Sequence, residues 1–361
     1  WLKSWLKFYT CQASASSSMA ALPFRHSSIV ISTGITMHCV EAYPPPGVPF
    51  RGTVVCVHGY PDTWYGWRKQ IRPIAELGFH VIVPDQRGYG DTSAPTQTVE
   101  YTMQKLCADN IALLDAIGVE QAVFLGHDFG GKLVWDLCLH HADRCYAVGS
   151  VCTPFNPNKP DRNPWLNMLQ ATGSRFDYQV WNNRAEAEFE FERNVERFIK
   201  LQIRSMEPSD VIRPVDKELW MKPPTIKGGI FAGLPEDPPK SHILTDADLA
   251  YYVRQFKTSG ARGPLNWYRN VERNWEWNKA VAGRKVTQPA LMVTAGGDTV
   301  LTAEAAKRIM PPHFHQLTLE HVEDAGHWIL QEKPEEVNAL ILKWLSSLPP
   351  VRGSDKRHSK L

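Results

Sequence analysis

Apolar residues recur along the chain in two alternating patterns. Short continuous apolar runs, of the kind that form buried strands, lie at residues 53–57, 80–84 and 121–125. Between them, apolar residues spaced three to four positions apart predict helices, of which the clearest covers 103–117 and ends at Gly118. Strands that alternate with helices predict an α/β fold, with a mostly parallel central sheet flanked by helices.

This alternation is interrupted in the middle of the chain. Further core elements are predicted as a hairpin at 28–40, strands at 147–152, 290–294 and 317–319, and helices from 303 and over 335–345. Residues 153–273 differ, because they are rich in proline, tryptophan and charge, with helical patterns at 186–203 and 246–256. Thr245 and Asp248 are spaced to cap the second of these helices.

The interruption predicts a core in two parts with an inserted lid. We expect the core to occupy residues 19–152 and 274–348, and a mainly helical lid domain to occupy 153–273. Residues 1–18 precede the first predicted strand and are excluded from the core. The proline-led polar residues 349–361 are expected to form a flexible tail.

The composition favours a small-molecule substrate. Charged residues make up 22% of the chain and the net charge is +2, so neither sign is in excess and nucleic acid is not an expected partner. No run reaches the roughly 18 apolar residues of a membrane helix, so we expect no membrane span. Cys56, Cys138 and Cys152 lie in apolar runs, which favours free buried thiols in a reducing compartment such as the cytoplasm.

A metal site and a cofactor are not expected. The chain has no HExxH motif, and its histidines and cysteines form no compact cluster along the sequence. The chemistry is therefore expected to come from side chains alone.

A sharp turn between a predicted strand and a helix carries an acidic residue. The segment GHDFGG, residues 126–131, joins the strand at 121–125 to a helical pattern. The small residues Gly126 and Gly130 let Asp128 project outward from such a tight turn. Because a carboxylate is ionised at neutral pH, Asp128 can displace a leaving group at an alkyl carbon and form an ester without an activating base.

Two later loops carry residues that can complete this chemistry. Hydrolysis of an ester needs water activated by a base, and His327 follows the last predicted strand. Asp298 follows the preceding strand and is expected to hold the imidazole in its useful tautomer. The chain order Asp128, Asp298, His327 is that of nucleophile, acid and histidine in hydrolases with a strand-to-helix elbow.

The motifs resemble those of the α/β-hydrolase superfamily. The aspartate in GHDFGG resembles the branch that includes epoxide hydrolases and haloalkane dehalogenases. From about residue 27 to 348, the order of HGYPDTWYGWR, DQRGYGDTSAP, GHDFGG, FDYQ, GPLNWYRN and EDAGHW is similar to that in the hydrolase domain of animal soluble epoxide hydrolases. The resemblance implies an α/β-hydrolase fold with a cap domain, and conversion of epoxides to vicinal diols. An apolar, aromatic lid suits lipid or aryl epoxides, and terpenoid epoxides equally.

The resemblance also implies roles for two lid tyrosines. Opening an epoxide ring leaves an alkoxide, so a neutral hydroxyl donor should face the nucleophile from the lid. Tyr178 in FDYQ and Tyr268 in LNWYRN resemble the paired lid tyrosines of soluble epoxide hydrolases. We therefore expect both to activate the epoxide oxygen.

Backbone donors and aromatic residues complete the expected site. HGYP resembles the His-Gly-x-Pro signature of epoxide hydrolases, which implies that Pro61 is cis. The backbone N–H groups of Tyr60 and Phe129 are expected to bind the oxyanion formed when water attacks the ester. Phe129, Trp267 and Trp328 are expected to line the substrate pocket.

Two other functions are compatible with parts of this pattern. A haloalkane dehalogenase would use the same Asp128, Asp298 and His327, but it needs N–H donors for a halide, and Phe129 has no side-chain N–H. A small-ligand receptor on a hydrolase scaffold would be marked by a degenerate triad, whereas every position here is filled. We rank these second and third.

The last three printed residues, Ser359-Lys360-Leu361, match the signal read by the peroxisomal import receptor. On a flexible basic tail such a signal is accessible. The sequence therefore predicts both cytoplasmic and peroxisomal location, with the import receptor as a partner.

Overall fold

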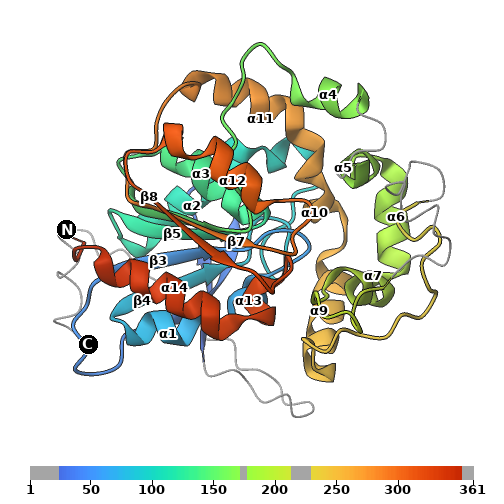
Figure 1. Cartoon of the computed structure of the whole chain (residues 1–361), viewed down its shortest axis with the longest axis horizontal. Coiled ribbons are helices and arrows are strands. Elements are labelled where there is room, and N and C mark those ends of the chain that lie inside the picture. Colours follow the sequence, from blue (N-terminus) through green and yellow to red (C-terminus); the bar gives the residue numbers. More distant parts are fainter. Residues whose placement is uncertain (1–23, 171–176, 213–228, 352–361) are drawn as a thin grey trace, which may run out of the picture.

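One mixed sheet forms the centre of the molecule (Figure 1). The computed structural model describes residues 24–170, 177–212 and 229–351. Within these ranges eight strands lie in the order β1-β2-β4-β3-β5-β6-β7-β8. Their bounds are β1 (Arg25–Val30), β2 (Thr36–Ala42), β3 (Gly52–Val57), β4 (Phe79–Pro84), β5 (Ala122–His127), β6 (Cys145–Val151), β7 (Ala290–Ala295) and β8 (Leu317–Val322).

The middle strands are buried on both faces. Every residue of β3, β4, β5 and β7 is buried, and their aliphatic side chains suit a strand that has helices on both sides. From β4 across to β8 neighbouring strands run parallel, whereas the hairpin β1–β2 joins the sheet antiparallel. The parallel strands therefore end at the same edge of the sheet, where their following loops gather.

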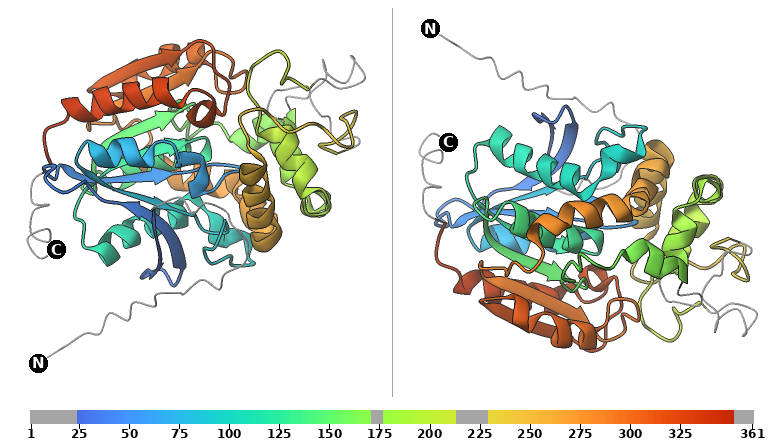
Figure 2. Two further views of the ribbon diagram at one scale, coloured as in Figure 1. Left: turned by 90° about the horizontal axis from the view of Figure 1, so that it is seen from below. Right: turned by 90° about the horizontal axis from the view of Figure 1, so that it is seen from above.

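Helices cover both faces of the sheet. α1 (Ile71–Glu76) and α14 (Pro334–Ser347) lie on one face, and α2 (Met103–Ile117) and α3 (Phe129–His140) on the other (Figure 2). The remaining core helices are η1 (Trp64–Trp67), η2 (Thr98–Tyr101), α12 (Ala303–Ile309), η5 (Pro311–His313) and α13 (Ile329–Glu332). The predicted helix at 103–117 is confirmed, and Gly118 ends it in the left-handed conformation with φ 66.

Between β6 and β7 the chain forms a helical insertion. Its helices are α4 (Pro164–Gln170), α5 (Asp177–Asn182), α6 (Ala185–Arg193), α7 (Val195–Gln202), α9 (Asp246–Ser259), α10 (Arg262–Asn266), η3 (Tyr268–Asn270), α11 (Val271–Asn278) and η4 (Lys279–Val281). Helices α5, α6, α7 and α9 lie to one side of the sheet in all views (Figures 1 and 2). Most of the insertion falls within the predicted lid, but α11 runs past residue 273 and η4 lies wholly beyond it. The division of the insertion from the core into a domain at 153–273 stays a prediction.

One predicted helix of the insertion is divided in the structure. The single pattern at 186–203 is two helices, because Asn194 leaves the helical conformation at φ −130 and ψ 32 between α6 and α7. The capping box at the start of α9 is confirmed: Thr245 Oγ1 accepts the N–H of Asp248 at 3.1 Å, and the N–H of Thr245 donates to Asp248 Oδ2 at 2.8 Å.

The described cysteines are free and buried, as the sequence predicts: Cys39, Cys56, Cys107, Cys138, Cys145 and Cys152. No helix in the described part of the chain is long and apolar enough to cross a membrane.

The expected tail begins with residues that pack on the core. The Tyr146 hydroxyl donates to the carbonyl oxygen of Pro349 at 2.8 Å, and the buried Val351 donates its N–H to the carbonyl of Arg51 at 3.0 Å. Residues 349–351 are thus held in place rather than flexible. Both the segment 1–18 and the Ser359-Lys360-Leu361 signal lie outside the described residues.

Candidate active site

Asp128 occupies the turn between β5 and α3. Its backbone has φ 53 and ψ −124. A sparsely populated conformation of this kind costs a non-glycine residue about 1–3 kcal/mol. Close packing fixes the turn, because a Cβ on Gly130 would lie 2.1 Å from the carbonyl oxygen of Val57 in β3, so only glycine lets α3 begin this near the sheet. The strand-to-helix elbow is therefore present where the sequence predicts it.

Three loops bring the predicted triad residues together. His327 follows β8 and Asp298 follows β7. The Nε2 atom of His327 lies 3.4 Å from Asp128 Oδ2, and its Nδ1 atom lies 2.7 Å from Asp298 Oδ2. The other oxygen of Asp298 accepts the N–H groups of Val300 and Leu301 at 2.9 and 2.8 Å, which fixes this carboxylate and, through it, the plane of the imidazole.

The charges of these three groups depend on one another. Burial alone would raise the pKa of both carboxyls, but the hydrogen bonds and charge of His327 lower the pKa of Asp128 and bring that of Asp298 to about 2. Burial would lower the pKa of His327, whereas its hydrogen bonds to Asp128 and Asp298 raise it well above the usual value. The resting site therefore holds an imidazolium between two carboxylates.

The HGYP loop supplies a backbone donor to Asp128. The N–H of Tyr60 donates to Asp128 Oδ1 at 2.8 Å, and the Tyr60–Pro61 peptide is cis as predicted. The buried His58 accepts the N–H of Gln86 at Nε2, at 2.9 Å, and so ties this loop to the loop after β4. His58 stands in the HGYP motif, but its partner Gln86 lies in a different loop. The sequence does not indicate this contact.

The two predicted lid tyrosines lie close together. Tyr178 in α5 and Tyr268 in η3 have ring centroids 6.0 Å apart. Tyr268 also packs edge-on against Phe129 at 4.8 Å and Tyr60 at 5.0 Å. Burial and then the charge of Asp128 raise the pKa of Tyr178 to about 12, and burial, Tyr178 and Asp128 raise the pKa of Tyr268 well above its usual value. Both phenols therefore remain protonated donors at neutral pH.

The three expected pocket aromatics lie on two sides of the triad. Phe129, the second expected backbone donor, is the first residue of α3 and packs against Trp267 with ring centroids 5.7 Å apart. Trp328 lies beside His327, with centroids 5.8 Å apart, and its indole N–H donates to the carbonyl of Gln202 in α7. Phe129 and Trp267 are thus grouped with Tyr268, and Trp328 with the histidine.

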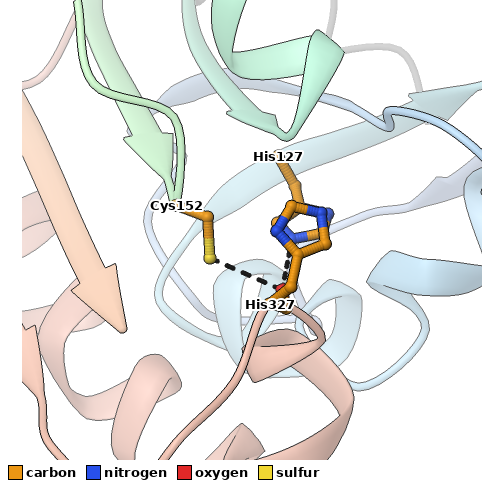
Figure 3. A group of neighbouring side chains, drawn as sticks. All are labelled: His127, Cys152 and His327. Carbon is orange, nitrogen blue, oxygen red and sulfur yellow. Dashed lines mark hydrogen bonds between the residues drawn. The ribbon is translucent and has the colours of Figure 1, made fainter. Parts of the chain in front are cut away.

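Two residues to which the sequence assigns no role hold the main chain at His327. The Nε2 atom of His127 lies 2.8 Å from the His327 carbonyl oxygen, and the Cys152 thiol donates to the same oxygen at 3.4 Å (Figure 3). A carbonyl only accepts, so Nε2 of His127 carries its proton. Burial lowers the pKa of His127 to about 4 and raises that of Cys152 to about 11, so both are uncharged donors.

The same three side chains, His127, Cys152 and His327, are the one group of metal-ligand type found in the described ranges. Their contacts do not favour a metal. Both nitrogens of His327 face carboxylates, and the Cys152 thiol and His127 N–H are directed at a carbonyl.

Comparison with known proteins identifies the family of the chain. The model of the alpha/beta hydrolase fold family matches residues 52–334. The chain is 41% identical over 323 residues to bifunctional epoxide hydrolase 2 of Sus scrofa, covering 89% of this chain and 55% of that protein. It is 35% identical over 325 residues to epoxide hydrolase A of Mycobacterium tuberculosis, covering 89% and 97%.

A solved structure of an epoxide hydrolase also matches this chain. The crystal structure of epoxide hydrolase A from Mycobacterium thermoresistibile matches with a TM-score of 0.77 at 32% identity, over 91% of this chain and 100% of that one. The chain spans about half the length, 55%, of the mammalian relatives that it matches.

Replacing Asp128 by asparagine should lower the pKa of His327. Asparagine has a similar size but no charge, so the imidazolium loses one of the two carboxylates that raise its pKa and keeps Asp298. An NMR titration of the imidazole protons measures the shift, with intact mass confirming the asparagine. His141, whose pKa responds to burial, Asp143 and Arg144, should titrate equally in both proteins. An unchanged pKa of His327 would show that the carboxylate of Asp128 does not contact the imidazole in solution.

Proposed function

The chain belongs to the epoxide hydrolase branch of the α/β-hydrolase family, and we propose that it opens epoxides to vicinal diols through an ester on Asp128. The observation that carries the proposal is the placement of charged groups on the core and of neutral hydroxyl donors on the insertion. An ionised carboxylate and its histidine belong to the core, and the protonated phenols of Tyr178 and Tyr268 belong to the insertion. A carboxylate suits attack on carbon, and neutral donors suit a leaving alkoxide.

The first step is alkylation of Asp128. One carboxylate oxygen attacks an epoxide carbon, the carbon–oxygen bond of the ring breaks, and its electron pair stays on the ring oxygen. Tyr178 or Tyr268 gives that oxygen its proton, and the second phenol donates a hydrogen bond. The lowered pKa of Asp128 keeps the nucleophile ionised, and the raised pKa values of the phenols keep the donors protonated.

The second step is hydrolysis of the ester by water. Esterification removes the charge of Asp128 and with it one of the contacts that raise the pKa of His327, so the imidazole can release its proton and act as a base. Water attacks the ester carbonyl, and the backbone N–H groups of Tyr60 and Phe129 bind the oxyanion. Collapse breaks the acyl–oxygen bond, frees the diol and regenerates Asp128. The proton that His327 released before hydrolysis goes to the tyrosinate, the first proton of the attacking water restores the imidazolium, and the second goes to the leaving oxygen of the diol.

The substrates are lipid or aryl epoxides under this proposal. Phe129, Trp267 and Tyr268 pack together beside the nucleophile, and such an aromatic wall contacts alkyl chains and aryl rings alike. The helical insertion acts as a lid that holds the phenols over Asp128.

The indole contacts weigh against a haloalkane dehalogenase. A halide leaving group needs N–H donors, but the N–H of Trp267 is directed at the carbonyl of Arg87 at 3.5 Å and that of Trp328 at the carbonyl of Gln202. Hydroxyl donors are what the site offers beside Asp128. The complete triad likewise weighs against a receptor without turnover.

Replacing Tyr178 or Tyr268 by phenylalanine should slow alkylation. Each change removes one donor to the developing alkoxide, and oxyanion donors are each worth about 2.7–4 kcal/mol, so the double variant should lose nearly all activity. Intact-mass detection of the ester in a single turnover measures the step. The matched control is Tyr251→Phe, another buried lid tyrosine, which stacks on Tyr65 with centroids 4.1 Å apart. Wild-type alkylation by the double variant would show that these phenols only pack.

A single turnover in oxygen-18 water tests the covalent mechanism. With enzyme in excess, the new oxygen of the first diol comes from Asp128, so the diol should be unlabelled and the heavy isotope should appear in the peptide that contains Asp128. His327→Gln should form the ester and then stall, because only hydrolysis needs a base, and the intact mass should rise by one substrate. Labelled diol with unlabelled Asp128 would instead make Asp128 a general base for direct attack by water.

We also propose that Ser359-Lys360-Leu361 directs the protein to peroxisomes when these residues form the free carboxyl terminus. A fluorescent protein fused ahead of the chain should then become punctate with a peroxisomal marker. Deleting Leu361 should return the signal to the cytoplasm. Identical diffuse signal with and without Leu361 would contradict the proposal.

A further inference from the structure

A turn of the insertion lies against the loop that carries His327. Residues 202–210, which we call the cap turn, begin at Gln202, the last residue of α7. Gln202 in this turn accepts the indole N–H of Trp328, the residue after the histidine. We call the loop that carries His327 the catalytic loop. Its first contact with the insertion is therefore made by the residue next to His327 in the sequence.

Glu332 makes the second contact, through both oxygens of its carboxylate. Oε2 accepts the N–H of Gly326, the residue before His327, at 2.8 Å, and Oε1 accepts the N–H of Met206 in the cap turn at 2.9 Å. One carboxylate thus bridges two backbone N–H groups from segments about 120 residues apart in sequence. Hydrogen bonds to a charged acceptor are the stronger kind, which suits a bridge.

The Met206 side chain covers the two loops that carry Asp298 and His327. A Cβ on Gly326 would lie 2.7 Å from Met206 Cγ, and a Cβ on Gly297, beside Asp298, would lie 2.6 Å from the same atom. Glycine at both positions lets the methionine seat this closely. Although 42% of Met206 is exposed, its inner side rests on the two loops that carry Asp298 and His327.

The cap turn is itself rigid. The buried carboxylate of Asp210 accepts the N–H and the hydroxyl of Ser205 at 2.8 and 2.9 Å, and it also accepts the hydroxyl of Ser241. Arg204 pairs with the same carboxylate at 2.8 Å. Glu332 therefore joins the catalytic loop to a turn of the insertion that Asp210 holds through several hydrogen bonds and an ion pair.

The catalytic loop is held from its other side by the core. His127 and Cys152 donate to the carbonyl oxygen of His327 from β5 and from the end of β6 (Figure 3). These core contacts fix one side of the histidine, and the contacts of Glu332 and Trp328 fix the other. The position of the imidazole thus depends on where the cap turn sits.

We infer that Glu332 is a positioning residue, which couples the cap turn to the loop of His327 and acts in ester hydrolysis. The inference rests on the proposed function for its kinetic consequence. Alkylation needs Asp128 and the phenols, whereas hydrolysis needs the imidazole aligned with a water molecule. A misplacement of about 1 Å can cost about 100-fold in rate, so loosening the loop should slow the second step selectively.

Three variants distinguish the loss of the hydrogen bonds of Glu332 from the loss of a negative charge near His327. Glu332→Ala removes both acceptor oxygens, and Glu332→Gln keeps one oxygen and removes the charge, so it should hold only one of the two N–H groups. Glu323→Gln is the matched control, because it makes the same charge change four residues before His327. The side chain of Glu323 is 83% exposed and pairs with His321.

Hydrogen–deuterium exchange on the 361-residue chain tests the coupling without any substrate. Peptides that cover the cap turn and residues 323–331 should both exchange faster in Glu332→Ala, and in Glu332→Gln at least one of them should, whereas Glu323→Gln should match the wild type. Unchanged exchange of both peptides in both Glu332 variants would overturn the coupling, with circular dichroism confirming that all variants are folded.

Single-turnover kinetics tests the consequence. With an epoxide that the wild type converts, Glu332→Gln should form the ester at the wild-type rate and hydrolyse it about 10- to 100-fold more slowly, so the ester should accumulate in the intact mass. Equal slowing of both steps, or no slowing, would overturn the positioning role. If the wild type forms no diol from fatty-acid, aryl or terpenoid epoxides, the proposed function fails, while hydrogen exchange still decides whether Glu332 couples the two segments.

Discussion

The contact of one imidazole with two carboxylates is the interaction on which the rest of the site depends. His327 reaches Asp128 at 3.4 Å with one nitrogen and Asp298 at 2.7 Å with the other, and each partner comes from a different loop. This contact is possible because β5, β7 and β8 run parallel and end at the same edge of the sheet. The order of the strands therefore brings the three side chains of the triad together, besides burying the apolar residues of the sheet.

The three loops need support that the triad cannot provide for itself. Asp128 holds a strained backbone, and the approach of α3 to β3 at Gly130 fixes it. His58 ties the HGYP loop to the loop after β4, and His127 holds the carbonyl of His327. Neutral histidines suit these positions, because each satisfies a buried backbone group without adding a charge beside the triad.

The sequence predicts those parts of the molecule that leave a local signal. Strands buried on both faces appear as unbroken apolar runs, and Asp128 and His327 are identifiable because each stands in a motif directly after a strand. Helix α10, with five residues, is too short to show a period. Glu332 stands in no such motif, and GHDFGG contains His127 without indicating its partner, since both side chains contact a backbone N–H or carbonyl that only the folded chain brings near.

The division of labour between core and insertion follows from electrostatics. A nucleophilic carboxylate and its imidazolium stabilise each other on the core, where burial of one charge is offset by the other. The phenols proposed as proton donors face the opposite requirement, because they must stay neutral beside an anion, and burial next to Asp128 raises the pKa of Tyr178 to about 12. A buried phenol needs a cover that excludes water, and a cover has to be aligned with the groups below it. The carboxylate of Glu332 accepts backbone N–H groups of both Met206 and Gly326, so the insertion that covers the phenols is joined directly to the loop that positions His327.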